Sequence, residues 1–171
     1  LTFAFSYHQR QGKPNMLGTM SEKERPRNGR GLTGTDGAAQ AGMIRREVEQ
    51  LKPLQRAVIV AKFSRPVACP HCSSPADTQE RKEAIEALAH HTLDVLKGER
   101  PNLALRRGLV RSQFGARMRM QDLAKECGVH QNTVTNHAKK VHDRLKELER
   151  AALMRRDETL AGIVSDELLP A

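Results

Sequence analysis

Apolar residues recur along most of the chain at steps of three and four, which is the period of an amphipathic helix. The spacing predicts an all-α protein, and no pair of strands is expected. The runs that carry the pattern are Leu54, Val58 and Ile59; Ala84, Ile85, Leu88, Val95 and Leu96; Leu105, Leu109, Val110 and Phe114; and Val134, Ala138, Val141, Leu145, Leu148 and Ala152.

Residues that start and stop helices separate these runs. Thr35-Asp36 is expected to cap a first helix that ends near Leu51, and Pro53 stands where a second helix begins. Ser74-Pro75-Ala76-Asp77 has a Ser cap followed by Pro at the first helical position, and it predicts the start of a third helix. Pro101 is expected to open a fourth helix.

Composition supports helices and indicates a polyanionic partner. Aromatic residues make up 3% of the chain, Trp is absent, and the formal net charge is +9. The surplus is local, because residues 100–156 hold 14 basic and 5 acidic side chains. A concentrated basic segment is the electrostatic footprint of nucleic acid. No run of residues is long and apolar enough for a membrane span, and an odd number of cysteines favours the cytoplasm.

The segment Met120–Leu145 reads MQDLAKECGVHQNTVTNHAKKVHDRL and has the pattern of two helices joined by a tight turn. Leu123 and the small Ala124 would face the second helix. Gly128 is expected to adopt the left-handed backbone that a tight corner requires, and Val129 to fill the corner. The second helix is expected to continue to about Arg156.

The second helix leaves a polar face for DNA. Asn and Gln side chains pair with adenine edges, Thr reaches phosphates or thymine methyl groups, and Lys neutralises the backbone. His137 stands three residues after Val134, at a position that is normally aliphatic. Either His137 is buried with a partner, or Ala138 takes the aliphatic position instead. The predicted DNA-binding residues are His130, Gln131, Asn132, Thr133, Thr135, Asn136, Lys139, Lys140 and Arg144.

The same residues resemble a known domain. MQDLAKECGVHQNTVTNHAKKVHDRLKEL is similar to the C-terminal, −35-reading domain of bacterial sigma-70 factors, and Leu109–Gly115 resembles the helix that enters it. The similarity covers residues 106–150 and implies that Gln131, Asn132 and Asn136 face bases. A chain of 171 residues holds too little sequence for the large preceding domains of a sigma factor.

A second resemblance involves Glu49–Phe63, EQLKPLQRAVIVAKF. A short basic protein with this segment and a sigma-like corner resembles the Q-type late antitermination proteins of lambdoid phages. The resemblance implies binding near a late promoter, contact with the bacterial RNA polymerase holoenzyme, and readthrough of terminators. Some members carry a zinc-binding insertion.

The insertion here contains a candidate metal site. Cys69 and Cys72 have the C-P-x-C spacing of a zinc knuckle, and His90 and His91 follow on the next helix. Two thiolates and two imidazoles would complete a tetrahedral structural Zn²⁺ site. Adjacent histidines diverge by about 100° on a helix, so His71 is an alternative ligand. The other interpretation is two ordinary thiols and two histidines that flank a helix face.

These expectations divide the chain into five segments: a flexible basic arm at 1–36, a helical pair at 37–65, the Cys- and His-containing insertion and helix at 66–99, the helix-turn-helix at 100–156 and an acidic tail at 157–171. The expected partner is double-stranded DNA, with no small-molecule substrate and no catalysis. Two alternatives are a repressor or activator that acts by occupancy alone, and a metal-dependent nuclease, which would need a β-hairpin leading into a helix.

Overall fold

The computed structural model describes residues 1–5, 34–68, 71–72, 74–96, 99–116 and 118–167, the last nine of these and 34–36 as backbone only. The protein is mostly helical, as its apolar spacing predicts. Its elements are α3 (Gly34–Glu49), α4 (Pro53–Phe63), β1 (Val67–Ala68), β2 (Pro75–Ala76), α5 (Gln79–Val95), α6 (Leu103–Gln113), α7 (Met120–Cys127) and α8 (Gln131–Glu167). In the described part of the chain, no helix is both long and apolar enough to cross a bilayer.

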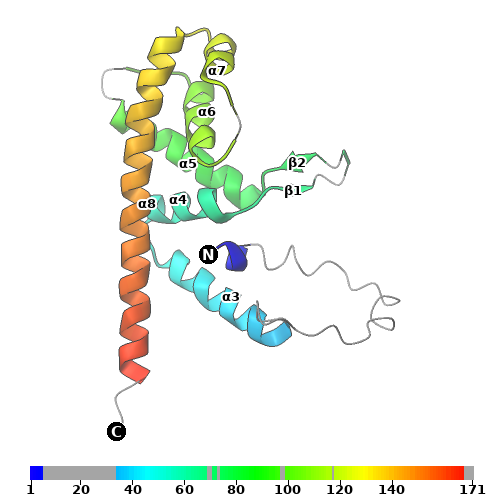
Figure 1. The fold of residues 1–171 in the computed structure, drawn as a ribbon, viewed down its shortest axis with the longest axis vertical. Helices are drawn as coiled ribbons and strands as arrows, with labels where there is room; N and C mark the ends of the chain where they lie inside the picture. Colours follow the sequence, from blue (N-terminus) through cyan, green and yellow to red (C-terminus); the bar gives the residue numbers. More distant parts are fainter. Residues whose placement is uncertain (6–33, 69–70, 73, 97–98, 117, 168–171) are drawn as a thin grey trace.

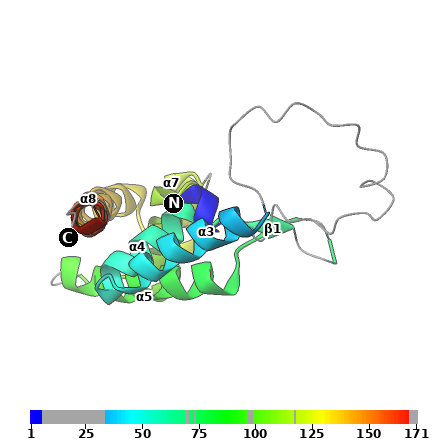
Figure 2. The ribbon, with the colours of Figure 1, turned by 90° about the horizontal axis from the view of Figure 1, so that it is seen from below.

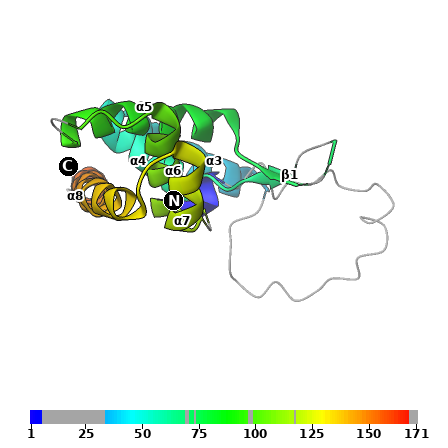
Figure 3. The same ribbon diagram turned by 90° about the horizontal axis from the view of Figure 1, so that it is seen from above.

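The long helix α8 runs the length of the molecule, and shorter helices pack along one side of it (Figure 1). Viewed from below, α3, α4 and α5 lie beside α8, and viewed from above, α6 and α7 lie beside its N-terminal end (Figures 2 and 3). Helix α8 contacts α3, α4, α5, α6 and α7. Helix α8 ends at Glu167, eleven residues beyond the predicted Arg156.

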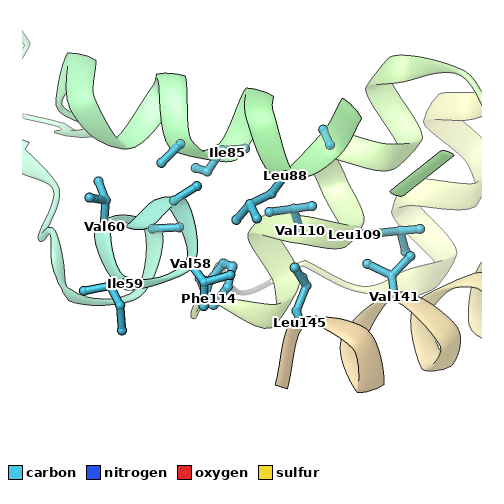
Figure 4. Packing of buried hydrophobic residues seen from close by; sticks show 14 of the residues in the cluster. Val58, Ile59, Val60, Ile85, Leu88, Leu109, Val110, Phe114, Val141 and Leu145 are labelled. Atoms are coloured by element: carbon cyan, nitrogen blue, oxygen red, sulfur yellow. The ribbon is translucent and has the colours of Figure 1, made fainter. Parts of the chain in front are cut away.

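The core is one continuous cluster between α4, α5, α6 and α8. Val58 of α4, Leu88 of α5, Leu109 of α6 and Val141 of α8 meet in it, all fully buried (Figure 4). Burying each such side chain stabilises the fold by about 1.5–3 kcal/mol. The predicted apolar stripe of α8 is buried at Val134, Ala138, Val141, Leu145 and Ala152.

Two buried arginines connect the helices through hydrogen bonds to backbone carbonyls. Arg81 of α5 is buried, and its two terminal nitrogens donate to the carbonyl oxygens of Ser64 and Phe114, each at 3.1 Å. Arg106 of α6 is also buried and donates to the carbonyl of Ala89 at 2.9 Å. The bonds of Arg81 satisfy the carbonyls of Ser64 and Phe114, the residues that end α4 and α6. Ala89 lies within α5, and its carbonyl also accepts from the hydroxyl of Thr92 at 2.7 Å.

The insertion differs from its prediction. Ser74 does not cap a helix, because Ala76 and Pro75 pair with Val67 and Ala68 in a short antiparallel hairpin. The cap is Thr78, whose hydroxyl accepts from the backbone N–H of Arg81 at 3.3 Å. The expectation of no strand pair was therefore wrong, and the hairpin leads directly into α5.

Part of the expected N-terminal arm is folded. Residues 2–5 form a helical turn, and Phe5 is buried in the core cluster with the guanidinium of Arg45 5.3 Å from its ring centroid. Ala4 packs against Ala41 of α3. The prediction of a flexible arm is wrong for residues 1–5 and for residues 34–36, which are the first residues of α3, while residues 6–33 lie outside the described part.

Candidate nucleic-acid interface

Helices α7 and α8 meet at a tight corner, which we call the α7–α8 corner (residues 120–145). Gly128 ends α7 with φ 66° and ψ 32°, the left-handed backbone expected of it, and its N–H donates to the last carbonyls of α7. Leu123 and Ala124 are buried beneath α8, as predicted, and Val129 packs against the core. Helices α6 and α7 pack closely because Gly108 of α6 leaves room for the side chain of Leu123.

The glycine at 108 is a feature that the sequence pattern did not single out. A Cβ placed there would lie 2.5 Å from Cδ1 of Leu123, which is itself buried. A side chain at this position would therefore require the buried Leu123 side chain, or α7 with it, to move. A glycine inside an apolar helical run is the sequence signal that could have indicated a close helix contact at this position.

The beginning of α8 is capped by a side chain. The Nδ1 atom of His130 accepts a hydrogen bond from the backbone N–H of Asn132 at 3.3 Å. This bond satisfies one of the donors that a helix leaves unpaired at its N-terminus. His130 is exposed, and with Gln121, Lys125 and Gln131 it borders a shallow hollow at the corner.

The predicted DNA-binding side chains lie on the surface, but on different sides of α8. Because a helix turns about 100° per residue, Asn136 and Lys139 lie within about 40° of Asn132, directly opposite Val141. Thr135 borders this stripe, whereas Lys140 and Arg144 lie on the flank. All of them are exposed except the half-buried Thr133 of that flank. We call Asn132, Thr135, Asn136 and Lys139 the outward stripe.

Several of these groups already have partners within the protein. The hydroxyl of Thr135 donates to the carbonyl of Gln131 at 3.0 Å, which leaves its methyl group and lone pairs available. Lys140 lies 3.3 Å from Glu99, and Arg144 lies 3.0 Å from Glu147. Lys139 has no ion-pair partner among the described residues, so its charge is the least compensated of the three.

His137 and Ala138 are both buried, so both side chains occupy the position that is normally aliphatic. The Nε2 atom of His137 pairs with the carboxylate of Glu99, which also contacts Lys140. Hydrogen bonds from these two residues hold the pKa of Glu99 below its usual value. Glu99 and the acidic Asp143, which continues the outward stripe, are charged residues that the sequence prediction did not include.

Cys127 is a partly buried residue at the end of α7. It packs against the core, and burial, with a smaller effect from Glu126, raises the pKa of its thiol.

The four predicted metal ligands are not brought together in the described residues. Cys72 and His71 are exposed in the turn of the hairpin, and Cys69 lies outside the described residues. His90 is eleven residues into α5, about 16 Å along its axis, and lies 3.4 Å from Glu86. His91 lies 3.4 Å from Asp94. Across the described part of the chain, no three His, Cys, Asp or Glu side chains are grouped to hold a metal ion.

The sequence matches no protein-family model, and no curated protein matches it significantly.

Proposed function

We propose that the protein binds double-stranded DNA through the α7–α8 corner, as a helix-turn-helix, and regulates transcription. The observation that carries the proposal is the outward stripe. Asn132, Thr135, Asn136 and Lys139 are exposed on the first turns of α8, immediately after the Gly128 turn, while the opposite face is locked into the core. In helix-turn-helix proteins, it is the first residues of the second helix that reach base edges in the major groove.

The chemistry of the stripe suits sequence reading. The amides of Asn132 and Asn136 can each donate and accept toward an adenine edge, and the methyl group of Thr135 suits thymine. Lys139, on the same side, and Lys140 and Arg144, on the flank, would contact phosphates. Lys140 would exchange its contact with Glu99 for a phosphate oxygen.

The type of regulation follows from resemblance. The sigma-like corner and the segment 49–63 support a Q-type antitermination factor that engages RNA polymerase near a late promoter in the bacterial cytoplasm. A repressor or activator that acts by occupancy is the alternative. A purified transcription assay on a template with a terminator separates the two, because only the first increases readthrough once bound.

The proposal is tested by selecting bound sequences from a random duplex pool. We expect one enriched motif for the natural protein, a relaxed motif for Asn132→Ala and Asn136→Ala, and an unchanged motif at lower affinity for Lys139→Ala. Gln79→Ala, which removes an exposed amide from α5, is the matched control and should leave motif and affinity unchanged. A lack of saturable binding even at low salt would contradict the proposal.

A nuclease is the second candidate, because the hairpin of β1 and β2 leads into α5 as such enzymes require. Such sites are built on His and Asn side chains, and here these are spread over two helices, with His90 and His91 on α5 and Asn136 and His137 on α8. Incubation with supercoiled plasmid and Mg²⁺ or Mn²⁺ tests it. Nicking that is lost in His90→Ala or His91→Ala would establish cleavage.

The zinc prediction is carried by the Cys69 and Cys72 spacing alone. The described residues supply Cys72 and His71 at the hairpin, and the Sγ atom of Cys72 lies 2.8 Å from the hydroxyl of Ser74. They do not complete a tetrahedral set there, so His90 and His91 are not retained as ligands in this proposal. A zinc ion held by the two thiolates would brace the hairpin.

A further inference from the structure

A second basic surface lies where the end of α4, the hairpin, the start of α5 and the end of α6 come together (Figure 1). It is a hollow of about 700 Å³, which we call the basic hollow. Among its described lining residues are five cationic side chains and a single carboxylate: Lys62, Arg65, Arg81, Lys82, Arg111 and Asp77.

The carboxylate cannot balance these cations. Asp77 lies 3.4 Å from Nε of Arg81 and 3.5 Å from Nη2 of Arg111, so two guanidinium groups share one negative charge. Lys62 is paired with Glu149 of α8. Lys82 is exposed and has no carboxylate partner among the residues that the structure describes. The basic hollow therefore carries a net positive charge.

Part of this charge is fixed in position. Arg81 is buried, and its bonds to the carbonyls of Ser64 and Phe114 prevent its guanidinium from turning toward solvent. Its Nε makes no hydrogen bond, and neither does the buried hydroxyl of Ser64, within the described structure. A buried cation with incomplete compensation favours an anion close by, because burial weakens screening by water.

We propose that the basic hollow binds a phosphate group, either free or part of a polynucleotide backbone. Guanidinium groups match the geometry of phosphate oxygens, and Lys82 supplies a mobile charge at the rim. Phe114 and Met118 form an apolar wall, which strengthens the attraction locally. The site uses other residues than the outward stripe, so it holds whether or not the α7–α8 corner binds DNA.

The first test is titration with inorganic phosphate against chloride at constant ionic strength, followed by NMR amide shifts and melting temperature. We expect shifts confined to residues of the hollow, and at least fivefold weaker binding in Lys82→Ala/Arg65→Ala. Arg46→Ala, which removes an exposed cation from α3, should bind phosphate as the natural protein does. Unchanged melting without phosphate confirms that the double variant folds. Shifts spread evenly over the surface, or equal affinity in the double variant, would overturn the proposal.

The second test identifies the source of the phosphate with a 30-base-pair duplex of random sequence. If the backbone occupies the hollow, the double variant binds the duplex several times more weakly, its salt slope falls by about one per lost contact, and phosphate competes. The same loss should be measured in an Asn136→Ala background. A response to phosphate alone assigns a free phosphate. Tighter binding of poly-L-glutamate than of phosphate would overturn the proposal in favour of an acidic peptide.

Discussion

The imidazole of His137, buried on the inner side of α8, contacts the carboxylate of Glu99, which precedes α6. The two residues are separated by 38 positions in the sequence. Their contact ties the first turns of α8, which carry the outward stripe, to the core at α6. Lys140 adds a second bond to the same carboxylate from the flank of α8.

Removing the carboxylate of Glu99 should make the stability of the protein depend less on pH in the acidic range. The pKa of Glu99 is held below its usual value, so its contribution is present at neutral pH and is lost as the pH falls through that lowered pKa. We expect Glu99→Gln to melt below the natural protein at pH 7, and the difference to shrink as the pH falls from 7 through the lowered pKa of Glu99. Glu83→Gln, on α5, is the control. A constant difference over this range would contradict the role given to Glu99.

An aliphatic residue should be tolerated in place of His137. The Nδ1 atom of His137 is buried without a hydrogen-bond partner in the described structure, and such a group costs about 1–3 kcal/mol. We expect His137→Leu to be as stable as the natural protein or up to about 1 kcal/mol more stable in urea unfolding, whereas His137→Ala loses about 1–3 kcal/mol by leaving a cavity. A large loss in the Leu variant would show that the contact with Glu99 outweighs the unpaired nitrogen.

Removing the charge of Asp143 should strengthen DNA binding. Asp143 is exposed and follows Lys139 by one turn on the outward stripe, so its carboxylate would approach the phosphates that the lysine neutralises. We expect Asp143→Asn to raise affinity about two- to fivefold for all duplexes, with a larger effect at low salt. Glu83→Gln again serves as control in fluorescence anisotropy. No change would place Asp143 away from the DNA.

Gly108 should be intolerant of even a methyl group. A Cβ there would lie 2.5 Å from Cδ1 of the buried Leu123, so the Leu123 side chain or α7 must shift, and we expect Gly108→Ala to cost about 1–3 kcal/mol. A Cβ at Gly42 of α3 would have nothing within 4 Å of it, and Gly42→Ala should stabilise the helix by up to about 1 kcal/mol. Chemical unfolding of both variants tests the contrast. Equal effects would show that α6 and α7 do not pack this closely.

Zinc, if bound, should depend on the cysteines of the hairpin and not on the histidines of α5. His90 and His91 lie near Glu86 and Asp94 instead of Cys72. We expect elemental analysis to find zinc lowered by Cys72→Ser and unchanged by His91→Ala, and a chelator to lower the melting temperature. Zinc lost in the histidine variant would instead support a site with both cysteines and the histidines of α5.

The sequence alone was sufficient where the cause is local. The three-and-four spacing of the α8 stripe, the helix start at Pro53 and the left-handed Gly128 all follow from backbone preferences and the helical period, and the structure contains each of them. The exposure of the outward stripe follows in turn, because one buried face of a helix determines the opposite one.

Only the tertiary structure decided which distant residues meet. Ser74 and Thr78 are both good caps, and the choice between them depended on the pairing of residues 67–68 with 75–76. The partner of His137, the close approach at Gly108 and the basic hollow join segments far apart in the chain. Such contacts depend on how helices pack, since local periodicity tells which face is buried and not what it is buried against.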